Sequence, residues 1–150
     1  MHRRLILACA LVLAGCGGAA KPHAAAKPHP SHTEQLKAVV RAWSTNLNAG
    51  NNAAEARLFS LPATMIQGQF VYRLVTSKQI ARWHAALPCS GRILSITVRG
   101  NFATAVFKLG NRPTSRCDAP GTLAAARFRI VRGRISVWEQ VPPPSEGQPA

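Results

Sequence analysis

The sequence predicts an α+β domain in which N-terminal helices pack on one face of a curved antiparallel sheet. Two observations support this fold class. Apolar residues recur at helical spacing early in the domain, and short alternating segments separated by turn residues follow them. The expected order of elements is ααβαββββ, and helices followed by a run of antiparallel strands are typical of α+β domains.

The first expected helix follows Ser31 and ends at Gly50. Ser31 and Glu34 form a capping-box pattern, which predicts a helix N-terminus at this point. Apolar residues then recur on one helical face, at Leu36, Val39, Val40, Trp43 and Leu47. Glycine is a common residue at the end of a helix.

Two shorter helices are expected further along the chain. The alanine-rich segment 52–59 predicts the second helix, closed by Leu61-Pro62. Thr76 and Gln79 form another capping box, and the third helix ends at Pro88. The larger side chains of this third helix are Ile80, Trp83, His84 and Leu87.

Alternating apolar residues predict one strand between the second and third helices and four strands after the third helix. The dipeptides Gly100-Asn101 and Arg132-Gly133 mark turns between them. The expected strand segments are 70–75, 93–98, 102–109, 122–131 and 135–141.

The first residues of the chain predict an export signal over residues 1–15. A basic start precedes an apolar run about half as long as the roughly 20 residues of a membrane-spanning helix. The following Leu13-Ala14-Gly15-Cys16 resembles the lipobox of bacterial lipoproteins. The resemblance implies that Cys16 carries diacylglycerol and palmitate, which anchor the protein to the extracytoplasmic face of the cell membrane. If Cys16 is instead a chance residue, the protein is secreted freely.

Two segments flank the expected domain, which covers residues 33–141. Residues 16–32 alternate Ala, Pro, Lys and His, with too few large apolar side chains to build a core, and predict a tether. Residues 142–150 predict a disordered tail. The histidines of the tether are not expected to bind a metal, because prolines separate them and no scaffold orients their rings.

The chain is strongly basic, with 19 Lys and Arg against 5 Asp and Glu. Such a charge favours anionic partners, for example phospholipid headgroups or anionic polymers of the cell envelope. Nucleic acid is not expected as a physiological partner of an exported protein. The alternative is that the arginines, which are dispersed along the domain, are solvated surface charges.

Two cysteines remain once the signal is removed and Cys16 is lipidated. Cys89 and Cys117 then face an oxidising compartment, and folding the chain about the Gly100-Asn101 turn brings their segments close together. A disulfide between them is therefore predicted. The alternative, a redox-active pair, is disfavoured because neither cysteine lies in a Cys-x-x-Cys spacing.

The order of elements resembles the nuclear-transport-factor-2-like superfamily, which includes the SnoaL-like cyclases and ketosteroid isomerase. The resemblance rests on Trp43 ahead of Asn48-Ala49-Gly50, on a second helix ending at Leu58-Phe59, and on the closing strand 133–138. It implies a cone-like sheet that wraps around a ligand pocket.

The carboxylates of the domain depart from the ketosteroid isomerase pattern, in which an aspartate base acts with tyrosine and protonated aspartate donors. Glu34 is expected in a helix cap, Glu55 on a short surface helix, and Asp118 in a loop beside the disulfide. Glu139 remains, on the last strand.

The possible pocket residues are Trp43, Tyr72, Trp83, His84, Trp138 and Glu139. His84 would act as an acid or base with Tyr72 as a donor. The alternative is that His84 packs beside Trp83 and that Tyr72 has a solvated hydroxyl. No phosphate loop, nucleophile triad or repeated metal-ligand spacing is present, so no cofactor or metal is expected.

These patterns favour a non-catalytic, lipid-anchored module that binds a small apolar ligand or an anionic component of the cell envelope. One alternative is a SnoaL-like isomerase, cyclase or hydrolase, and another is a protein-interaction module of an envelope complex. The sequence leaves the oligomeric state open, with a homodimer among the alternatives.

Overall fold

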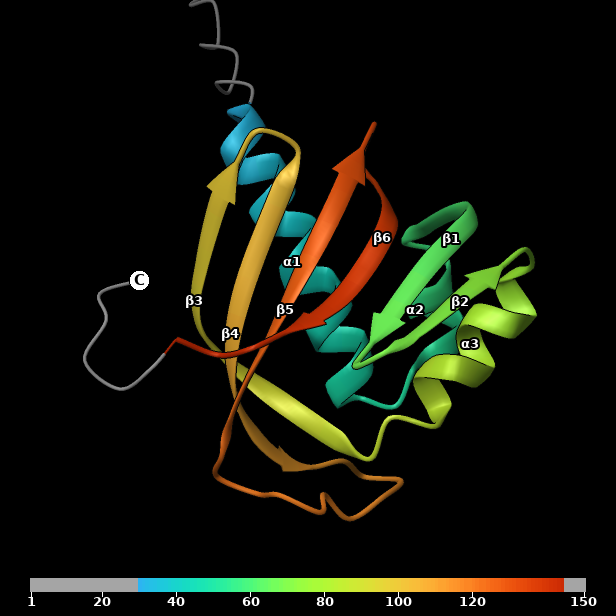
Figure 1. Cartoon of the computed structure of the whole chain (residues 1–150), viewed down its shortest axis with the longest axis vertical. Coiled ribbons are helices and arrows are strands. Elements are labelled where there is room, and N and C mark those ends of the chain that lie inside the picture. The colour runs from blue at the N-terminus through green and yellow to red at the C-terminus, as the bar shows by residue number, and fades with distance from the viewer. Residues whose placement is uncertain (1–29, 145–150) are drawn as a thin grey trace, which may run out of the picture.

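The computed structural model describes residues 30–144, which form three helices and one six-stranded sheet (Figure 1). The predicted signal over residues 1–15, with Cys16, lies outside the described residues, as do the tether up to residue 29 and the tail from residue 145. Among the described helices, none combines the length and the apolar composition that crossing a bilayer requires.

The helices begin where the caps predict them. Helix α1 (His32–Asn48) has Ser31 as its N-cap, whose hydroxyl accepts a hydrogen bond from the backbone N–H of Glu34. The Glu34 carboxylate does not complete the capping box, since it pairs with Lys37 at 3.0 Å. Two shorter helices follow, α2 (Asn52–Ala56) and α3 (Ser77–Ala85), and α3 begins with the complete capping box of Thr76 and Gln79.

The sheet has the strand order β2-β1-β6-β5-β4-β3. Its strands are β1 (Phe59–Gln67), β2 (Phe70–Leu74), β3 (Cys89–Arg99), β4 (Phe102–Asn111), β5 (Leu123–Val131) and β6 (Arg134–Val141). Neighbouring strands are antiparallel except β1 and β6, which pair in parallel. The α+β class with a curved sheet is therefore confirmed, and the sheet is mixed where a wholly antiparallel one was expected.

Strand β1 is absent from the predicted order, which becomes ααββαββββ. The expected second helix over 52–59 ends at Ala56, and the chain then enters β1. Proline is normally unfavourable within a strand, because it cannot donate to the ladder. Here Pro62 falls where the β1–β6 register shifts, between Phe59 and Thr64, so no regular ladder position has to include it.

The core lies between α1 and the concave face of the sheet (Figure 1). The ring of Trp43 on α1 contacts Phe128 of β5 at 5.0 Å and Phe107 of β4 at 5.8 Å between centroids. At the start of α1, Nε2 of His32 lies 3.3 Å from the carbonyl oxygen of Gly100 in the β3–β4 turn. The helix therefore runs antiparallel to β3, and its C-terminal half lies over the beginning of that strand.

Candidate functional site

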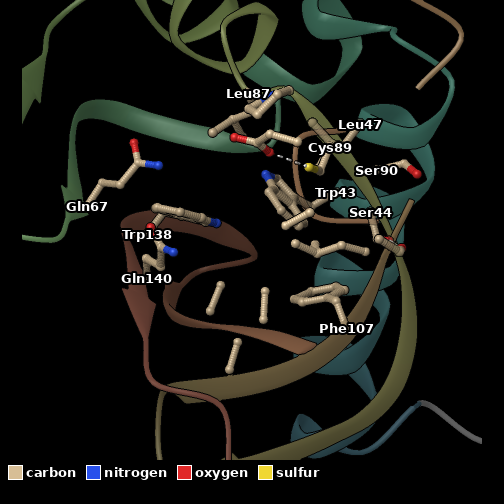
Figure 2. Close-up of a pocket in the computed structure, with 18 residues that line it drawn as sticks. Trp43, Ser44, Leu47, Gln67, Leu87, Cys89, Ser90, Phe107, Trp138 and Gln140 are labelled. Atoms are coloured by element: carbon tan, nitrogen blue, oxygen red, sulfur yellow. Dashed lines mark hydrogen bonds between the residues drawn. The ribbon is translucent and has the colours of Figure 1, made fainter. Parts of the chain in front are cut away.

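A pocket of about 310 Å³ opens at the C-terminal half of α1, against β3, β4 and β5 (Figure 2). Aromatic and aliphatic side chains form most of its lining, and three consecutive alanines of β5 leave space opposite them. The larger apolar lining residues are Trp43, Leu47, Leu87, Phe107, Leu109 and Trp138. Polar groups are contributed by Ser44, Gln67, Ser90, Asp118 and Gln140. The volume is at the lower end of the range for small-molecule sites.

One wall of the pocket is fixed by hydrogen bonds between α1 and β3. Ser44 Oγ and Asn48 Nδ2 both donate to the carbonyl of Gly91, at 3.1 and 3.0 Å. The N–H of Gly91 in turn donates to Asn48 Oδ1 at 2.9 Å. A Cβ at residue 91 would lie 3.0 Å from the Cβ of Phe107, so glycine allows this close approach.

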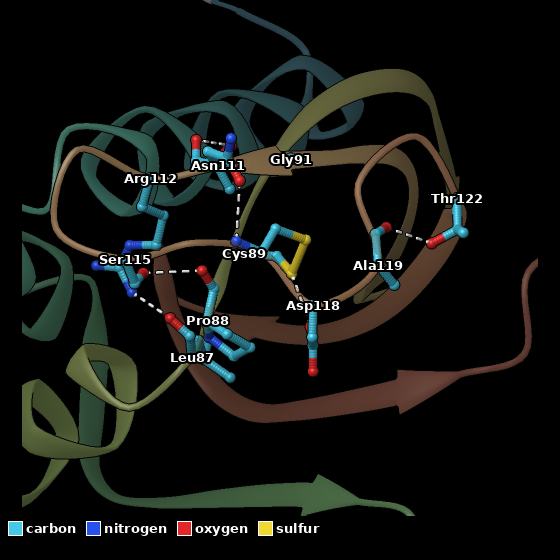
Figure 3. Close-up of a disulfide and its surroundings, with 12 residues drawn as sticks. Leu87, Pro88, Cys89, Gly91, Asn111, Arg112, Ser115, Asp118, Ala119 and Thr122 are labelled. Carbon is cyan, nitrogen blue, oxygen red and sulfur yellow. Dashed lines mark hydrogen bonds between the residues drawn. A yellow bond between two sulfur atoms is a disulfide. The ribbon is translucent and has the colours of Figure 1, made fainter.

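The rim of the pocket carries the disulfide between Cys89 and Cys117, whose Cα atoms are 4.4 Å apart (Figure 3). The predicted pairing is confirmed. Asn111 Oδ1 accepts a hydrogen bond from the N–H of Cys117 at 3.0 Å, which holds the loop after β4 against the strand end. Asp118 Oδ1 lies 3.3 Å from Sγ of Cys89. Because disulfide sulfur has no proton or free thiolate, this cluster offers neither a thiol donor nor thiolate metal ligands.

The predicted pocket residues separate into two groups. Trp43 and Trp138 both line the pocket, with their ring centroids 6.3 Å apart. Trp83 lies against Trp138 at 4.8 Å and supports it from α3, without lining the pocket itself.

The other predicted residues lie elsewhere. Tyr72 is 41% exposed on the edge strand β2, stacked on Phe70. Glu139 alternates with the inward-facing Trp138 and so points to the outer face of β6, where its Oε2 accepts hydrogen bonds from Arg127. His84 is fully buried and is not among the residues that line the pocket.

His84 belongs to a buried polar cluster that the sequence did not predict. Its Nε2 lies 3.2 Å from Oε1 of Glu55, and neither side chain is exposed. Its Nδ1 lies 2.9 Å from the carbonyl oxygen of Ile80, an acceptor, so the geometry assigns the ring proton to Nδ1. Nε2 is then the acceptor for the indole N–H of Trp43, at 3.0 Å. The expectation that Glu55 lies on a surface helix is therefore wrong.

Burial keeps both groups of this pair neutral. It raises the pKa of Glu55 to about 9, although the positive charge of Arg112 opposes the rise. Burial also lowers the pKa of His84 to about 4, against the effect of the hydrogen bond to Ile80. The one lone pair of His84 Nε2 already accepts the indole N–H of Trp43, so the approach of Glu55 is a close contact between neutral groups, and neither carboxyl oxygen of Glu55 has a hydrogen-bond partner among residues 30–144.

Arg112 joins the cluster to the end of α3. Its Nη1 donates to the carbonyls of His84 and Leu87, at 2.8 and 2.7 Å, and its Nη2 donates to Asn52 Oδ1 at 2.9 Å. The side chain is 5% exposed. A cation that binds terminal helix carbonyls also interacts favourably with the helix dipole.

Glu55 was missed because its segment contains few large side chains. Arg112 follows a strand in a loop rich in Pro and Gly, where sequence alone favours exposure.

Solved structures with the same architecture identify the fold. An NTF2-like protein of unknown function from Cytophaga hutchinsonii matches with a TM-score of 0.58 at 11% identity, over 77% of this chain and 93% of that one. A candidate polyketide cyclase from Sinorhizobium meliloti matches with a TM-score of 0.60 at 19% identity, over 74% of this chain and 100% of that one. The domain has the nuclear-transport-factor-2-like fold.

A candidate ketosteroid isomerase from Kribbella flavida shares this fold, with a TM-score of 0.58 at 18% identity over 78% of this chain and 84% of that one. No family model and no curated protein matches the sequence. Identities this low show the fold alone. The cone-like shape that the family resemblance implied is thus confirmed, and the chemistry has to be argued from the residues of this chain.

The pocket of this domain is suited to an apolar molecule with a polar end. Indole and phenyl rings form its walls, whereas the amides of Gln67 and Gln140 lie toward one side (Figure 2). Ser44 and Ser90 already donate to backbone carbonyls of the protein. The side chain of His84 contacts the pocket wall through the indole of Trp43.

Proposed function

We propose that the protein is an exported, lipid-anchored carrier that binds a small apolar molecule in its cone pocket. The observation that supports this most directly is the pocket of about 310 Å³ between α1 and the sheet. Burial of apolar surface contributes about 25 cal/mol per Å², so a ligand that fills such a pocket gains most of its affinity from contact with the walls.

Binding without catalysis is favoured by where the ionisable groups lie. Asp118 is the one carboxylate among the residues that line the pocket, and it lies at the exposed rim beside the disulfide. The Glu55–His84 pair lies behind Trp43, out of contact with a ligand in the pocket.

The lipid anchor is the second part of the proposal. It rests on the lipobox Leu13-Ala14-Gly15-Cys16, and the disulfide on the pocket rim agrees with an oxidising compartment. The test is fractionation of cells that produce the Cys16→Ala variant. The variant is expected to leave the membrane fraction, and retention there would contradict the anchor.

The ligand is tested with residues 16–150 carrying Cys16→Ser, purified under oxidising conditions without added ligand. Native mass spectrometry is expected to show a bound apolar molecule, whose mass identifies it. Binding is then measured by the quenching of tryptophan fluorescence, because Trp43 and Trp138 line the pocket.

A matched pair of variants connects the binding to the pocket. Ala124→Leu fills space in the pocket lining, whereas Ala38→Leu adds the same volume on the exposed face of α1. We expect at least a tenfold loss of affinity in Ala124→Leu and no change in Ala38→Leu. Equal affinity in the two variants would place the ligand elsewhere, and the absence of any ligand would favour a protein-interaction module.

A SnoaL-like isomerase, cyclase or hydrolase is the alternative. The observation that favours it is the titratable Glu55–His84 pair next to the pocket wall. This pair becomes accessible to a ligand if the indole of Trp43 moves. In that case Glu55→Gln abolishes turnover while ligand affinity is retained. If binding and turnover fall together, the effect is structural and the enzyme hypothesis loses this support.

A further inference from the structure

One end of the domain brings together the start of α1 and the turns of two hairpins (Figure 1). His32 of α1 contacts the carbonyl of Gly100 in the β3–β4 turn at 3.3 Å. The N–H of Ile130, near the end of β5, donates to the carbonyl of Asn101 at 2.8 Å. We call this the hairpin end and define it by five exposed residues, which are Arg99, Phe102, Arg129, Val131 and Arg132.

The hairpin end presents arginine on both sides of an exposed aromatic ring. Arg99 is paired with Phe102 across β3 and β4, and Phe102 is paired with Arg129 across β4 and β5. Directly paired residues project from the same face of a sheet, so Arg99, Phe102 and Arg129 share one face, and the guanidinium group of Arg127 lies 5.7 Å from the centre of the Phe102 ring. Phe102 is 42% exposed, and Val131 nearby is 37% exposed.

The arginines of the hairpin end have no carboxylate partner among residues 30–144. The neighbouring Arg127 differs, since its Nη2 lies 2.6 Å from Oε2 of Glu139. No ion pair in this part of the chain includes Arg99, Arg129 or Arg132. Cations without counter-ions are common among residues 30–144, and here three of them lie on the hairpins that expose Phe102 and Val131. This combination suits an anionic partner that also accepts apolar side chains.

We propose that the hairpin end docks on the anionic phospholipid surface of the membrane. The planar guanidinium group binds phosphate with two parallel hydrogen bonds, and aromatic side chains are enriched at the level of the lipid headgroups. Each basic residue near an anionic bilayer contributes attraction that decays within about 8 Å at physiological salt, so the arginines act only when this end touches the surface.

The course of the chain favours a bilayer over a soluble anionic polymer. Helix α1 begins at the hairpin end, and only 15 residues separate His32 from Cys16. Such a segment spans at most about 50 Å when extended. If Cys16 carries the proposed lipid, the hairpin end is the part of the domain that follows the anchor most directly along the chain.

This docking orients the pocket. Strand β3 runs 11 residues from Cys89 on the pocket rim to Arg99 at the hairpin end. At about 3.3 Å per residue the strand is roughly 30 Å long along its course, with the pocket rim at one end and the hairpin end at the other. With Arg99 on the membrane, the pocket rim therefore faces away from the bilayer, and the ligand enters from the aqueous side.

The test uses residues 16–150 with Cys16→Ser, so that no lipid anchor contributes. The docking proposal rests on the proposed lipid anchor, but vesicle binding is measured without that anchor. A failure of the docking proposal can therefore be distinguished from a failure of the anchor. Binding is measured by co-sedimentation with phosphatidylcholine vesicles that either contain or lack phosphatidylglycerol. The native chain is expected to bind only the anionic vesicles, and added salt is expected to release it.

Two triple variants with equal net charge decide whether the hairpin end is the docking surface. The first carries Arg99→Gln, Arg129→Gln and Arg132→Gln, and is expected to lose affinity by about 100-fold. The second, the control, removes three exposed cations from the other half of the domain with Arg92→Gln, Lys108→Gln and Arg116→Gln, and is expected to lose less than tenfold.

Several outcomes would overturn the proposal. Equal losses in both triple variants would mean that net charge alone attracts the protein. Equal binding to neutral vesicles, or no binding to anionic vesicles, would remove its electrostatic basis. A Phe102→Ala variant separates the apolar contribution, and we expect a several-fold loss of affinity. The melting temperature of each variant confirms that the fold is retained.

Discussion

Nε2 of His84 lies 3.2 Å from Oε1 of Glu55, and both side chains are completely buried. Groups of this kind normally form ion pairs at the surface, yet here both are neutral because burial disfavours either charge. The pair supports the indole N–H of Trp43, which is also a wall of the pocket. The protonation state of the Glu55–His84 pair therefore affects the stability of the core directly.

The first prediction is that stability falls as the pH rises above 6.5. The unfolded chain releases the Glu55 proton near the ordinary pKa of 4.5, whereas the folded protein holds it up to about 9. The free energy of unfolding therefore decreases as the pH rises between these values, by at most about 1.4 kcal/mol per pH unit. His84 has the opposite effect, because its pKa falls from 6.5 to about 4 on folding. It raises the free energy of unfolding as the pH rises between these values and adds no further change above pH 6.5.

Glu55→Gln isolates the contribution of this carboxyl. The amide keeps the size and polarity of the neutral carboxyl but does not titrate, so the free energy of unfolding should lose most of its decline between pH 6.5 and 9. Urea denaturation over this range measures it. Glu139→Gln, which removes an outer-face carboxylate, should leave the decline in place. An unchanged slope in Glu55→Gln would mean that Glu55 is ionised in the folded protein.

The second prediction concerns Arg112, whose guanidinium group binds two carbonyls at the end of α3 and one side chain of α2. Arg112→Met keeps much of the volume but removes the donor of the Leu87 carbonyl and of Asn52 Oδ1, whereas the carbonyl of His84 still accepts from the N–H of Leu87. We expect a loss of about 3 kcal/mol in the free energy of unfolding. The exposed Arg116→Met is the control, expected to change stability by less than about 0.5 kcal/mol. Similar values for the two variants would contradict the role of Arg112.

The sequence predicted those parts of the fold that local patterns determine. The face of α1 that carries Trp43 follows from helical spacing, and the β3–β4 hairpin follows from its turn residues. Cys89 and Cys117 paired as predicted, since the other two cysteines of the sequence, Cys9 and Cys16, were expected to belong to the signal and the lipid anchor. Strand β1 was missed because Pro62 normally ends regular structure, and only a register shift against β6 accommodates it.

The buried cluster could not be predicted, because its members come from distant parts of the chain. Glu55, His84 and Arg112 become neighbours only when α2, α3 and the end of β4 are assembled. Charged residues are rarely buried, so Glu55 was expected at the surface, and His84 was considered only with Tyr72 or Trp83. The same long-range assembly explains why Tyr72, chosen for its chemistry, lies on an exposed edge strand away from the pocket.

The third prediction concerns the close contact between Gly91 and Phe107. In Gly91→Ala the new Cβ would lie 3.0 Å from the Cβ of Phe107, so the strand or the ring has to shift. We expect a loss of about 1 to 3 kcal/mol in stability and weaker ligand binding, since both residues line the pocket. Gly110→Ala is the control, because its nearest neighbour is the Ser90 hydroxyl at 3.3 Å. Equal effects of the two substitutions would contradict this account.

The fourth prediction is that the Cys89–Cys117 disulfide stabilises the domain and shapes the pocket rim. A sequence separation of 28 residues corresponds to about 3.5 kcal/mol of chain entropy in the unfolded state. The variant Cys89→Ser with Cys117→Ser should therefore lose about 3 kcal/mol, and the native protein in reductant should match it. Ligand affinity should fall as well, because Cys89 and Asp118 line the rim. If reduction, verified by thiol titration, leaves stability unchanged, the bridge contributes no stability, and the hydrogen bond from the Cys117 N–H to Asn111 Oδ1 is sufficient to hold the loop.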